Sequence, residues 1–230
     1  EVFANLSETG EWPSEKPPIH IHEKNTFFSL KIKTIYDNQH QVLWHVATLL
    51  DITHQKMTQK VVEHQASYDD LTGLPNYRLF KKVLLDEILI SHHHQKQFAL
   101  LSLDIDYFKL INDTYGHELG DLLLKQFAKR LKKSIRTTDV VIRRGGDEFN
   151  IILKNIKEID SVKKFARTLL KNVRLEFIIH DIHLNISISI GIVFFPTDAQ
   201  KIKELIKKAD DAMYVSKHKG RNTFTLWNEL

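Results

Sequence analysis

One short segment constrains the fold of this chain more than any other. Residues 143–149 read Arg-Arg-Gly-Gly-Asp-Glu-Phe and join two hydrophobic runs, 140–142 and 149–153. Two such runs around a glycine pair predict a β-hairpin with a tight turn. The glycines allow positive φ angles and let a ligand approach the backbone, because no Cβ stands in the way. Asp147 and Glu148 follow at once, and a turn with only a structural role rarely concentrates charge in this way.

A second acidic cluster ends another predicted strand. Asp104-Ile105-Asp106 follows the hydrophobic run 98–103. If this strand neighbours the hairpin, the carboxylates of Asp104, Asp147 and Glu148 converge on one point. Carboxylate oxygens suit Mg²⁺, which takes few protein ligands and completes its shell with phosphate oxygens. The simpler alternative is that acids often terminate strands without a further role.

Two cations stand near the end of the last predicted helix. Lys217 and Arg221 lie four residues apart, so they share a face if the helix extends that far. A lysine and an arginine together suit polyphosphate oxygens. Cations at a helix C-terminus also simply complement the helix dipole, so the pair alone leaves both interpretations open. With a metal on the other side, the layout is typical of nucleotidyl transfer.

Composition narrows the classes that remain. The chain has 230 residues, an apolar share of 42%, no cysteine, a net charge of +4 and a pI of about 9.0. The absence of cysteine excludes disulfides and fits a reducing, cytoplasmic compartment. No apolar run reaches the roughly 18 residues of a membrane helix. Basic residues alternate with acids, as in 201–204, so we expect a triphosphate pocket rather than a nucleic-acid surface. The chain opens on Glu1, and we expect it to be the cytoplasmic part of a longer protein, in which a membrane anchor could lie upstream.

The chain divides into three parts by pattern. Residues 27–36 and 41–50 predict an antiparallel hairpin, followed by a polar helix over 54–66. That helix is either a solvated linker or a short coiled coil, and the pattern favours neither. From Asp70 onward, strands alternate with amphipathic helices around the acidic hairpin. This predicts an α/β fold with a mixed central sheet covered by helices.

Five separated motifs together resemble the GGDEF family of diguanylate cyclases. They occur in order over residues 67–230 and comprise Asp70-Leu71-Thr72-Gly73-Leu74-Pro75-Asn76; Asp104 through Phe108-Lys109, Asn112-Asp113 and Gly116-His117 to Gly120-Asp121; Arg144 to Phe149; Ser189-Ile190-Gly191; and Ala209-Asp210 through Tyr214 and Lys217 to Gly220-Arg221-Asn222. The resemblance implies a fold similar to the polymerase palm and to nucleotidyl cyclases. It implies condensation of two GTP molecules into cyclic di-GMP, with Mg²⁺ or Mn²⁺ as the metal. Tyr77 departs from the arginine that the family commonly has, and Ser216 replaces a frequent alanine.

The resemblance also assigns roles, which we state as expectations. The metal ligands would be Asp104, the Ile105 carbonyl, Asp147 and Glu148, and the catalytic residues Glu148, Asp147 and Lys217. Substrate would contact Phe108, Lys109, Asn112, Asp121, Gly145, Gly146, Lys217 and Arg221. An ionised Asp121 only accepts hydrogen bonds, so it suits the N1–H and 2-amino group of guanine and not adenine.

The same resemblance predicts assembly and feedback. One pocket holds one GTP, so two domains must face each other as a homodimer. Arg136 and Asp139 match the RxxD motif of the family and would form an inhibitory site for cyclic di-GMP. Residues 1–53 resemble the C-terminal half of a PAS domain, which would act as a sensor, and 54–66 would be the linker helix. The rival interpretations are a non-catalytic receptor for GTP or cyclic di-GMP, and a structural dimerisation module.

Overall fold

The structure, a computed structural model, describes residues 26–230 and forms two compact units. The first unit comprises residues 1–64 and the second residues 65–230. Within the described residues, no helix is both long and apolar enough to cross a membrane.

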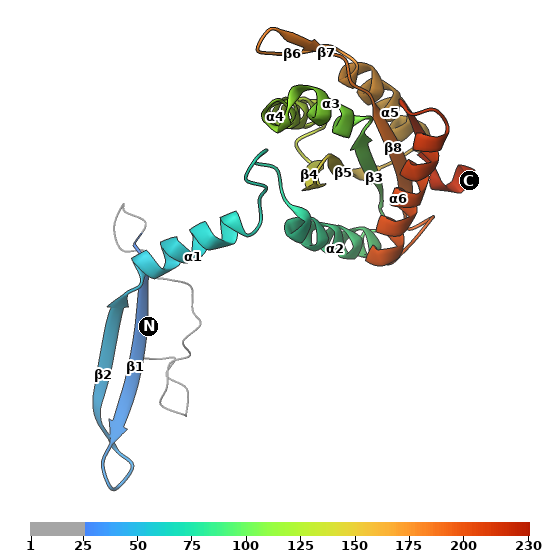
Figure 1. Ribbon diagram of the computed structural model, residues 1–230. Coiled ribbons are helices and arrows are strands. Elements are labelled where there is room, and N and C mark those ends of the chain that lie inside the picture. The colour runs from blue at the N-terminus through green and yellow to red at the C-terminus, as the bar shows by residue number, and fades with distance from the viewer. Residues whose placement is uncertain (1–25) are drawn as a thin grey trace. The chain divides into compact units, whose positions relative to one another are not determined.

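The first unit contains a hairpin followed by a helix (Figure 1). Its elements are β1 (Phe28–Tyr36), β2 (Val42–Asp51) and α1 (Thr53–Gln65). The strands are antiparallel, and the Asp37 carboxylate accepts the backbone N–H groups of Gln39 and Gln41 at 2.8 Å each, which fixes the turn. The predicted hairpin and helix are therefore confirmed. Residues 1–25 of the segment that resembles a PAS domain lie outside the described residues.

The hairpin buries little apolar surface within its own unit. Every residue of β2 is exposed, and the Trp44 side chain is 70% exposed. On β1, only Ile32 and Thr34 are buried. The first unit thus differs from the second, which has a cluster of buried hydrophobic residues on each face of its sheet.

The second unit is an α/β domain built on one five-stranded sheet. Its elements are α2 (Tyr77–His93), β3 (Gln97–Ile105), α3 (Phe108–Tyr115), α4 (His117–Ser134), β4 (Val140–Gly145), β5 (Glu148–Ile156), α5 (Ile159–Val173), β6 (Phe177–Ile179), β7 (Ile182–Leu184), β8 (Ile188–Phe195), α6 (Ile202–His218), β9 (Thr223–Leu226) and a final 3₁₀ turn (Trp227–Glu229). The strand order is β4-β5-β3-β8-β9, and only the β8–β9 pair is parallel. This confirms the predicted mixed sheet.

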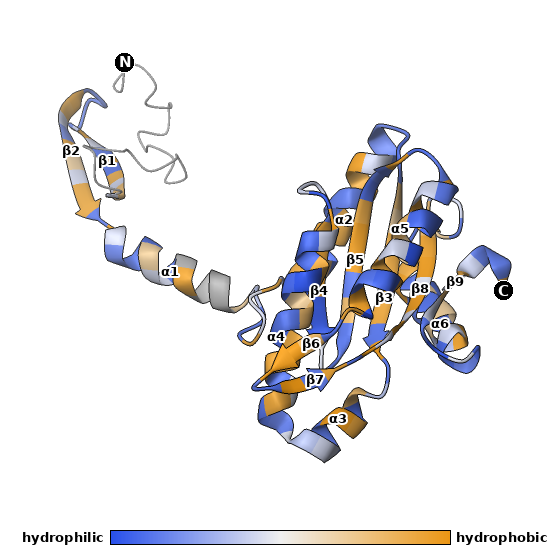
Figure 2. Ribbon diagram, turned by 90° about the horizontal axis from the view of Figure 1, so that it is seen from above, coloured by the Kyte–Doolittle hydropathy of each residue, from blue (hydrophilic) through white to orange (hydrophobic). Residues whose placement is uncertain are grey.

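Helices cover both faces of the sheet, and the two-residue period of the strands decides which side chain meets which helix. On β3, Ala99, Leu101 and Leu103 pack with α4 and α5, whereas Phe98 and Leu100 pack with α2 and α6. Figure 2 shows the resulting apolar strands between helices that are each polar on one side. Ser102 and Asp104 belong by this period to the face that α6 covers.

α6 approaches the sheet closely at one glycine. A Cβ at Gly191 of β8 would lie 2.0 Å from the Ala209 carbonyl oxygen and 2.2 Å from the Met213 nitrogen. Only glycine allows this distance, and the close approach brings the C-terminal half of α6 to the ends of β3 and β8.

The alternating pattern of residues 184–195 predicts one long strand, and the structure differs from this prediction in two respects. The chain forms a separate small hairpin, β6–β7, and β8 begins only at Ile188. β8 is also buried at every position rather than at alternate ones. Its place near the middle of a sheet covered on both faces explains the continuous burial.

Candidate active site

The acidic turn and the acidic strand end meet in the sheet, as the sequence predicts. β3 and β5 are antiparallel neighbours, and their register pairs Asp104 with Glu148. β4 and β5 close around a two-residue turn, Gly146-Asp147, in which Gly146 has a φ angle of 53°. Arg143 donates from Nε and Nη2 to the Gly146 carbonyl at 3.0 and 2.8 Å and so fixes the turn. The carboxylates of Asp104, Asp147 and Glu148 therefore lie at one end of the sheet.

Asp104 is a buried acid in a crowded electrostatic environment. Its residue is 7% exposed, and the Lys217 ammonium lies 2.8 Å from its Oδ2. Burial raises the pKa of Asp104 to about 6, because the opposing effect of Lys217 is smaller and the charges of Asp147 and Glu148 act in the same direction as burial. Burial and the neighbouring acids together therefore disfavour the ionised form of Asp104, although Lys217 favours it.

This donor set fits a hard divalent cation. A carboxylate whose pKa is raised by burial and, to a smaller extent, by two neighbouring acids is stabilised in its ionised form when a cation binds beside it. Within residues 26–230, no three acid, imidazole or thiol side chains form a complete metal cage. Mg²⁺ does not require one, since it usually binds one or two carboxylates, substrate phosphates and water. The residues that would hold it are Asp104, Asp147 and the Ile105 carbonyl, with Glu148 adjacent.

The two predicted phosphate cations would share a helical face only if the last helix extended to Arg221, and it does not extend that far. α6 ends at His218, and Arg221 lies in the loop before β9 with a φ angle of 64°. The helix ends because Gly220 takes a positive φ of 104° and the Arg221 N–H returns to the Ser216 carbonyl at 3.1 Å. Lys217 nonetheless reaches Asp104.

The predicted base-binding residues lie where α3 meets α4. Asn112 of α3 packs against Gly120 of α4, so closely that a Cβ at Gly120 would lie 1.9 Å from Asn112 Oδ1. Asp121 follows Gly120 and is exposed. Asn112 Oδ1 is buried and has no hydrogen-bond partner among the described residues. Because a buried polar atom without a partner is costly, this oxygen is suited to accept from a ligand.

The remaining predicted substrate residues occupy the start of α3 and the acidic turn. Phe108 is buried and Lys109 is exposed on the first turn of α3. Gly145 and Gly146 are exposed, with positive φ angles of 154° and 53°, and a Cβ at either would meet no neighbour. Their absence of side chains leaves the backbone of the turn accessible.

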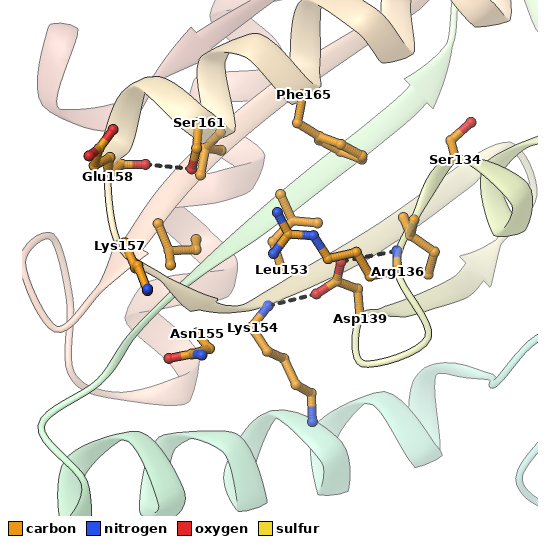
Figure 3. Close-up of a pocket in the computed structure, with 13 residues that line it drawn as sticks. Ser134, Arg136, Asp139, Leu153, Lys154, Asn155, Lys157, Glu158, Ser161 and Phe165 are labelled. Atoms are coloured by element: carbon orange, nitrogen blue, oxygen red, sulfur yellow. Dashed lines mark hydrogen bonds between the residues drawn. The ribbon is translucent and has the colours of Figure 1, made fainter.

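Arg136 and Asp139 line a separate pocket of about 590 Å³ (Figure 3). Asp139 Oδ2 accepts a hydrogen bond from the backbone N–H of Arg136 at 3.2 Å, and its Oδ1 accepts one from the backbone N–H of Lys154 at 3.0 Å. Phe165 of α5 and Lys157 complete one side of the pocket. Asp139 therefore has a structural role in addition to its predicted part in the inhibitory site.

Sequence reasoning missed a polar network beside Glu148. Arg144 donates to Asp210 Oδ2 at 2.8 Å, and its Nε lies 3.7 Å from Glu148 Oε2. Asp210 Oδ1 in turn accepts the Ser102 hydroxyl at 2.9 Å. The Arg144 guanidinium also lies over the ring of Tyr77, at 5.4 Å from its centroid. The one signal in the sequence was Tyr77, which departs from the family pattern.

Comparison with known proteins identifies the family. The family described as "Diguanylate cyclase, GGDEF domain" matches residues 66–223. MucR of Pseudomonas aeruginosa, named a bifunctional diguanylate cyclase/cyclic di-GMP phosphodiesterase, is 40% identical over 159 residues, which are 69% of this chain and 23% of MucR. Diguanylate cyclase A of Treponema denticola is 31% identical over 194 residues, 83% of this chain and 51% of that protein. The chain spans about half of these curated relatives or less.

Solved structures give the same result. The GGDEF domain of TpbB from Pseudomonas aeruginosa has a TM-score of 0.67 at 33% identity, covering 69% of this chain and 93% of that one. The coiled coil and GGDEF domain of DgcB from Caulobacter crescentus, in complex with cyclic di-GMP, has a TM-score of 0.69 at 25% identity, covering 76% and 93%. The chain therefore belongs to the GGDEF diguanylate cyclase family.

Proposed function

We propose that the second unit is a diguanylate cyclase that condenses two GTP molecules into cyclic di-GMP and releases two pyrophosphates. One observation carries the proposal: Asp104 and Glu148 are register partners, so the acids of two distant segments lie together beside Lys217. Membership of the family supports it. Several relatives are named diguanylate cyclases, which supports it as well.

Each half of the reaction is a nucleotidyl transfer. The 3′-oxygen of one GTP attacks the α-phosphorus of the other, a new P–O bond forms, and the bond to pyrophosphate breaks. The proton of the 3′-hydroxyl leaves to the Glu148 carboxylate, which lies at the rim of the site. The second half repeats these events with the roles of the two nucleotides exchanged.

The charged residues would act mainly by neutralising phosphate. Mg²⁺ or Mn²⁺, held by Asp104, Asp147 and the Ile105 carbonyl, would supply positive charge at the α- and β-phosphates. Lys109, Lys217 and Arg221 would bind the remaining phosphate oxygens. Backbone amides at Phe108, Gly145 and Gly146 can approach the triphosphate closely.

Guanine would be selected at the contact of α3 and α4. Asp121 accepts from guanine N1–H and the 2-amino group, whereas adenine presents an acceptor at N1. Asn112 lies against Gly120, the neighbour of Asp121, so both side chains can reach one base.

Assembly and control complete the proposal. One site binds one GTP, so turnover requires two domains related by a twofold axis. Arg136 and Asp139 would bind cyclic di-GMP in their pocket and inhibit synthesis. The hairpin β1–β2, as the remnant of a PAS-like sensor, and α1 would set the geometry of the dimer.

Incubation of the purified protein with GTP and Mg²⁺ tests the proposal. The expected result is cyclic di-GMP, identified by chromatography and mass spectrometry, with none from Glu148→Gln. Tight GTP binding without product would instead support a receptor. The absence of both GTP binding and product would support a structural module and would refute the enzyme.

A further inference from the structure

Asp106 lies two residues after Asp104 and has no role in the proposed reaction. Both of its carboxylate oxygens nevertheless accept hydrogen bonds. Asp106 is 4% exposed. Its Oδ1 accepts the Ser189 hydroxyl at 2.7 Å, and its Oδ2 accepts the Ser187 hydroxyl at 2.5 Å and the backbone N–H of Asn222 at 3.0 Å. All donors that contact it come from β8, the segment before β8 and the loop after α6.

The Asn222 contact anchors a backbone in an unfavourable conformation. Gly220, Arg221 and Asn222 have consecutive φ angles of 104°, 64° and 48°. Left-handed conformations are disfavoured for residues that carry a Cβ, so such a loop persists only where its surroundings hold it. Asp106 supplies a charge-assisted hydrogen bond at the residue that follows Arg221.

The neighbour of Asp106 contacts the side chain of the same arginine. The Arg221 guanidinium lies over the Tyr107 ring, 4.5 Å from its centroid. Tyr107 itself has a φ angle of 59° and is 61% exposed, so its ring is presented outward rather than packed in the core. A stacked guanidinium uses its face and keeps its N–H donors in the plane free for phosphate oxygens.

We propose that Asp106 and Tyr107 are positioning residues for Arg221, which hold its backbone and its guanidinium so that it binds the GTP phosphates beside the metal ligands. The inference rests on the proposed function of the site. Asp104 and Asp106 stand on one strand end, so the metal-binding carboxylate and the anchor of the phosphate-binding loop move together. The distance between the metal site and Arg221 would then be fixed by the two-residue separation of Asp104 and Asp106, and not only by the flexible side chain of Arg221.

Affinity for 3′-deoxy-GTP in the presence of Mg²⁺ tests this, because the analogue lacks the attacking hydroxyl and binding is measured without turnover. Tyr107→Ala should raise its Kd about two- to fivefold, the range expected for an exposed cation–π contact. Tyr107→Phe should bind within about twofold of the unsubstituted protein, because the ring face remains. Tyr36→Ala, a matched loss of a tyrosine in the first unit, should leave the Kd unchanged.

A double-mutant cycle separates positioning from a general structural effect. Arg221→Ala alone should weaken binding about tenfold. In that background Tyr107→Ala should add no more than about 1.5-fold, because the ring acts through the guanidinium. Additive losses, or no loss in Tyr107→Ala, would overturn the proposal.

Asp106 is tested by the same cycle, with stability followed in parallel. Asp106→Ala should weaken binding about as much as Arg221→Ala and add little to it, whereas Asp106→Asn should retain most of the affinity, since its amide oxygen still accepts from Asn222 N–H. Should Asp106→Ala fail to fold, the Asn variant and the Tyr107 cycle decide the question. Failure of the unsubstituted protein to bind the analogue would contradict the proposed function, and this inference with it; binding with additive losses would overturn only the positioning role.

Discussion

Two groups of acids lie on the same domain and differ in what their oxygens contact. Asp106 and Asp139 accept hydrogen bonds from backbone N–H groups or hydroxyls through both carboxylate oxygens. Asp104 is buried as well, but its neighbours include two further acids, and its pKa is raised to about 6. Acids whose oxygens accept hydrogen bonds stabilise the fold. Acids that lie close together repel one another, and a bound cation relieves that repulsion. The contacts of each carboxylate therefore distinguish structural acids from catalytic ones. The sequence alone places both kinds at the ends of strands or in loops.

The largest effect that tests this contrast is on turnover. Glu148→Gln and Asp147→Asn should each lower the rate of cyclic di-GMP synthesis by about 10²- to 10⁴-fold, because a base or a metal ligand is lost. The melting temperature should change little, since both residues lie on a partly exposed turn. Asp160→Asn, an exposed acid of α5, is the control and should retain full activity. If either turn variant forms product at the rate of the unsubstituted protein, the substituted acid has no catalytic role.

The next effect concerns feedback through the pocket beside Asp139. Arg136→Ala should raise the concentration of cyclic di-GMP needed for half-inhibition by about tenfold or more, because one charged hydrogen-bonding partner is lost. Initial rates at several product concentrations measure it. An inhibition curve that coincides with that of the unsubstituted protein would show that the pocket does not bind the product.

A smaller effect is expected on stability at Asp139. Asp139→Ala leaves the N–H groups of Arg136 and Lys154 without their acceptor, so the free energy of unfolding should fall by about 1–3 kcal/mol. Urea denaturation of this variant beside Glu148→Gln makes the comparison direct. If the two variants are equally stable, the distinction between structural acids and acids of the active site is wrong.

The smallest effect is a pH dependence at Asp104. A folded-state pKa raised from 3.8 to about 6 means that the protonated acid is favoured on folding, so this contribution to stability is present below pH 4 and is lost as the pH rises through 6. Without divalent metal, Asp104→Asn should therefore be more stable than the unsubstituted protein at pH 8, by on the order of 1 kcal/mol, the shift being discounted for solvent screening. Thermal denaturation in EDTA measures it. A destabilised Asp104→Asn at pH 8 would mean that the Lys217 ion pair dominates.

The sequence predicts those parts of the site that depend on short-range patterns. The hydrophobic runs around Gly145-Gly146 predict the β4–β5 hairpin, and the hydrophobic run 98–103 places Asp104 at the end of a strand. The cap of α2 is equally local, since Asn76 accepts the N–H groups of Arg78 and Leu79.

Features that depend on tertiary contacts were not predictable. The conformation of the loop that carries Arg221 depends on Asp106, which accepts the backbone N–H of Asn222 from 116 positions away. Similarly, the Arg144–Asp210 contact joins β4 to α6 across 66 positions. No local pattern distinguishes these polar residues from solvated ones, because their partners are defined only once the sheet has formed.

The central claim is that acids from β3 and from the β4–β5 turn bind one divalent cation beside the nucleotide. Mn²⁺ binding in the presence of 3′-deoxy-GTP, followed by electron paramagnetic resonance, tests it most directly. Our account predicts tight nucleotide-dependent Mn²⁺ binding that is weakened by Asp104→Asn and by Asp147→Asn alike. Mn²⁺ affinity that is the same in both variants as in the unsubstituted protein would contradict it.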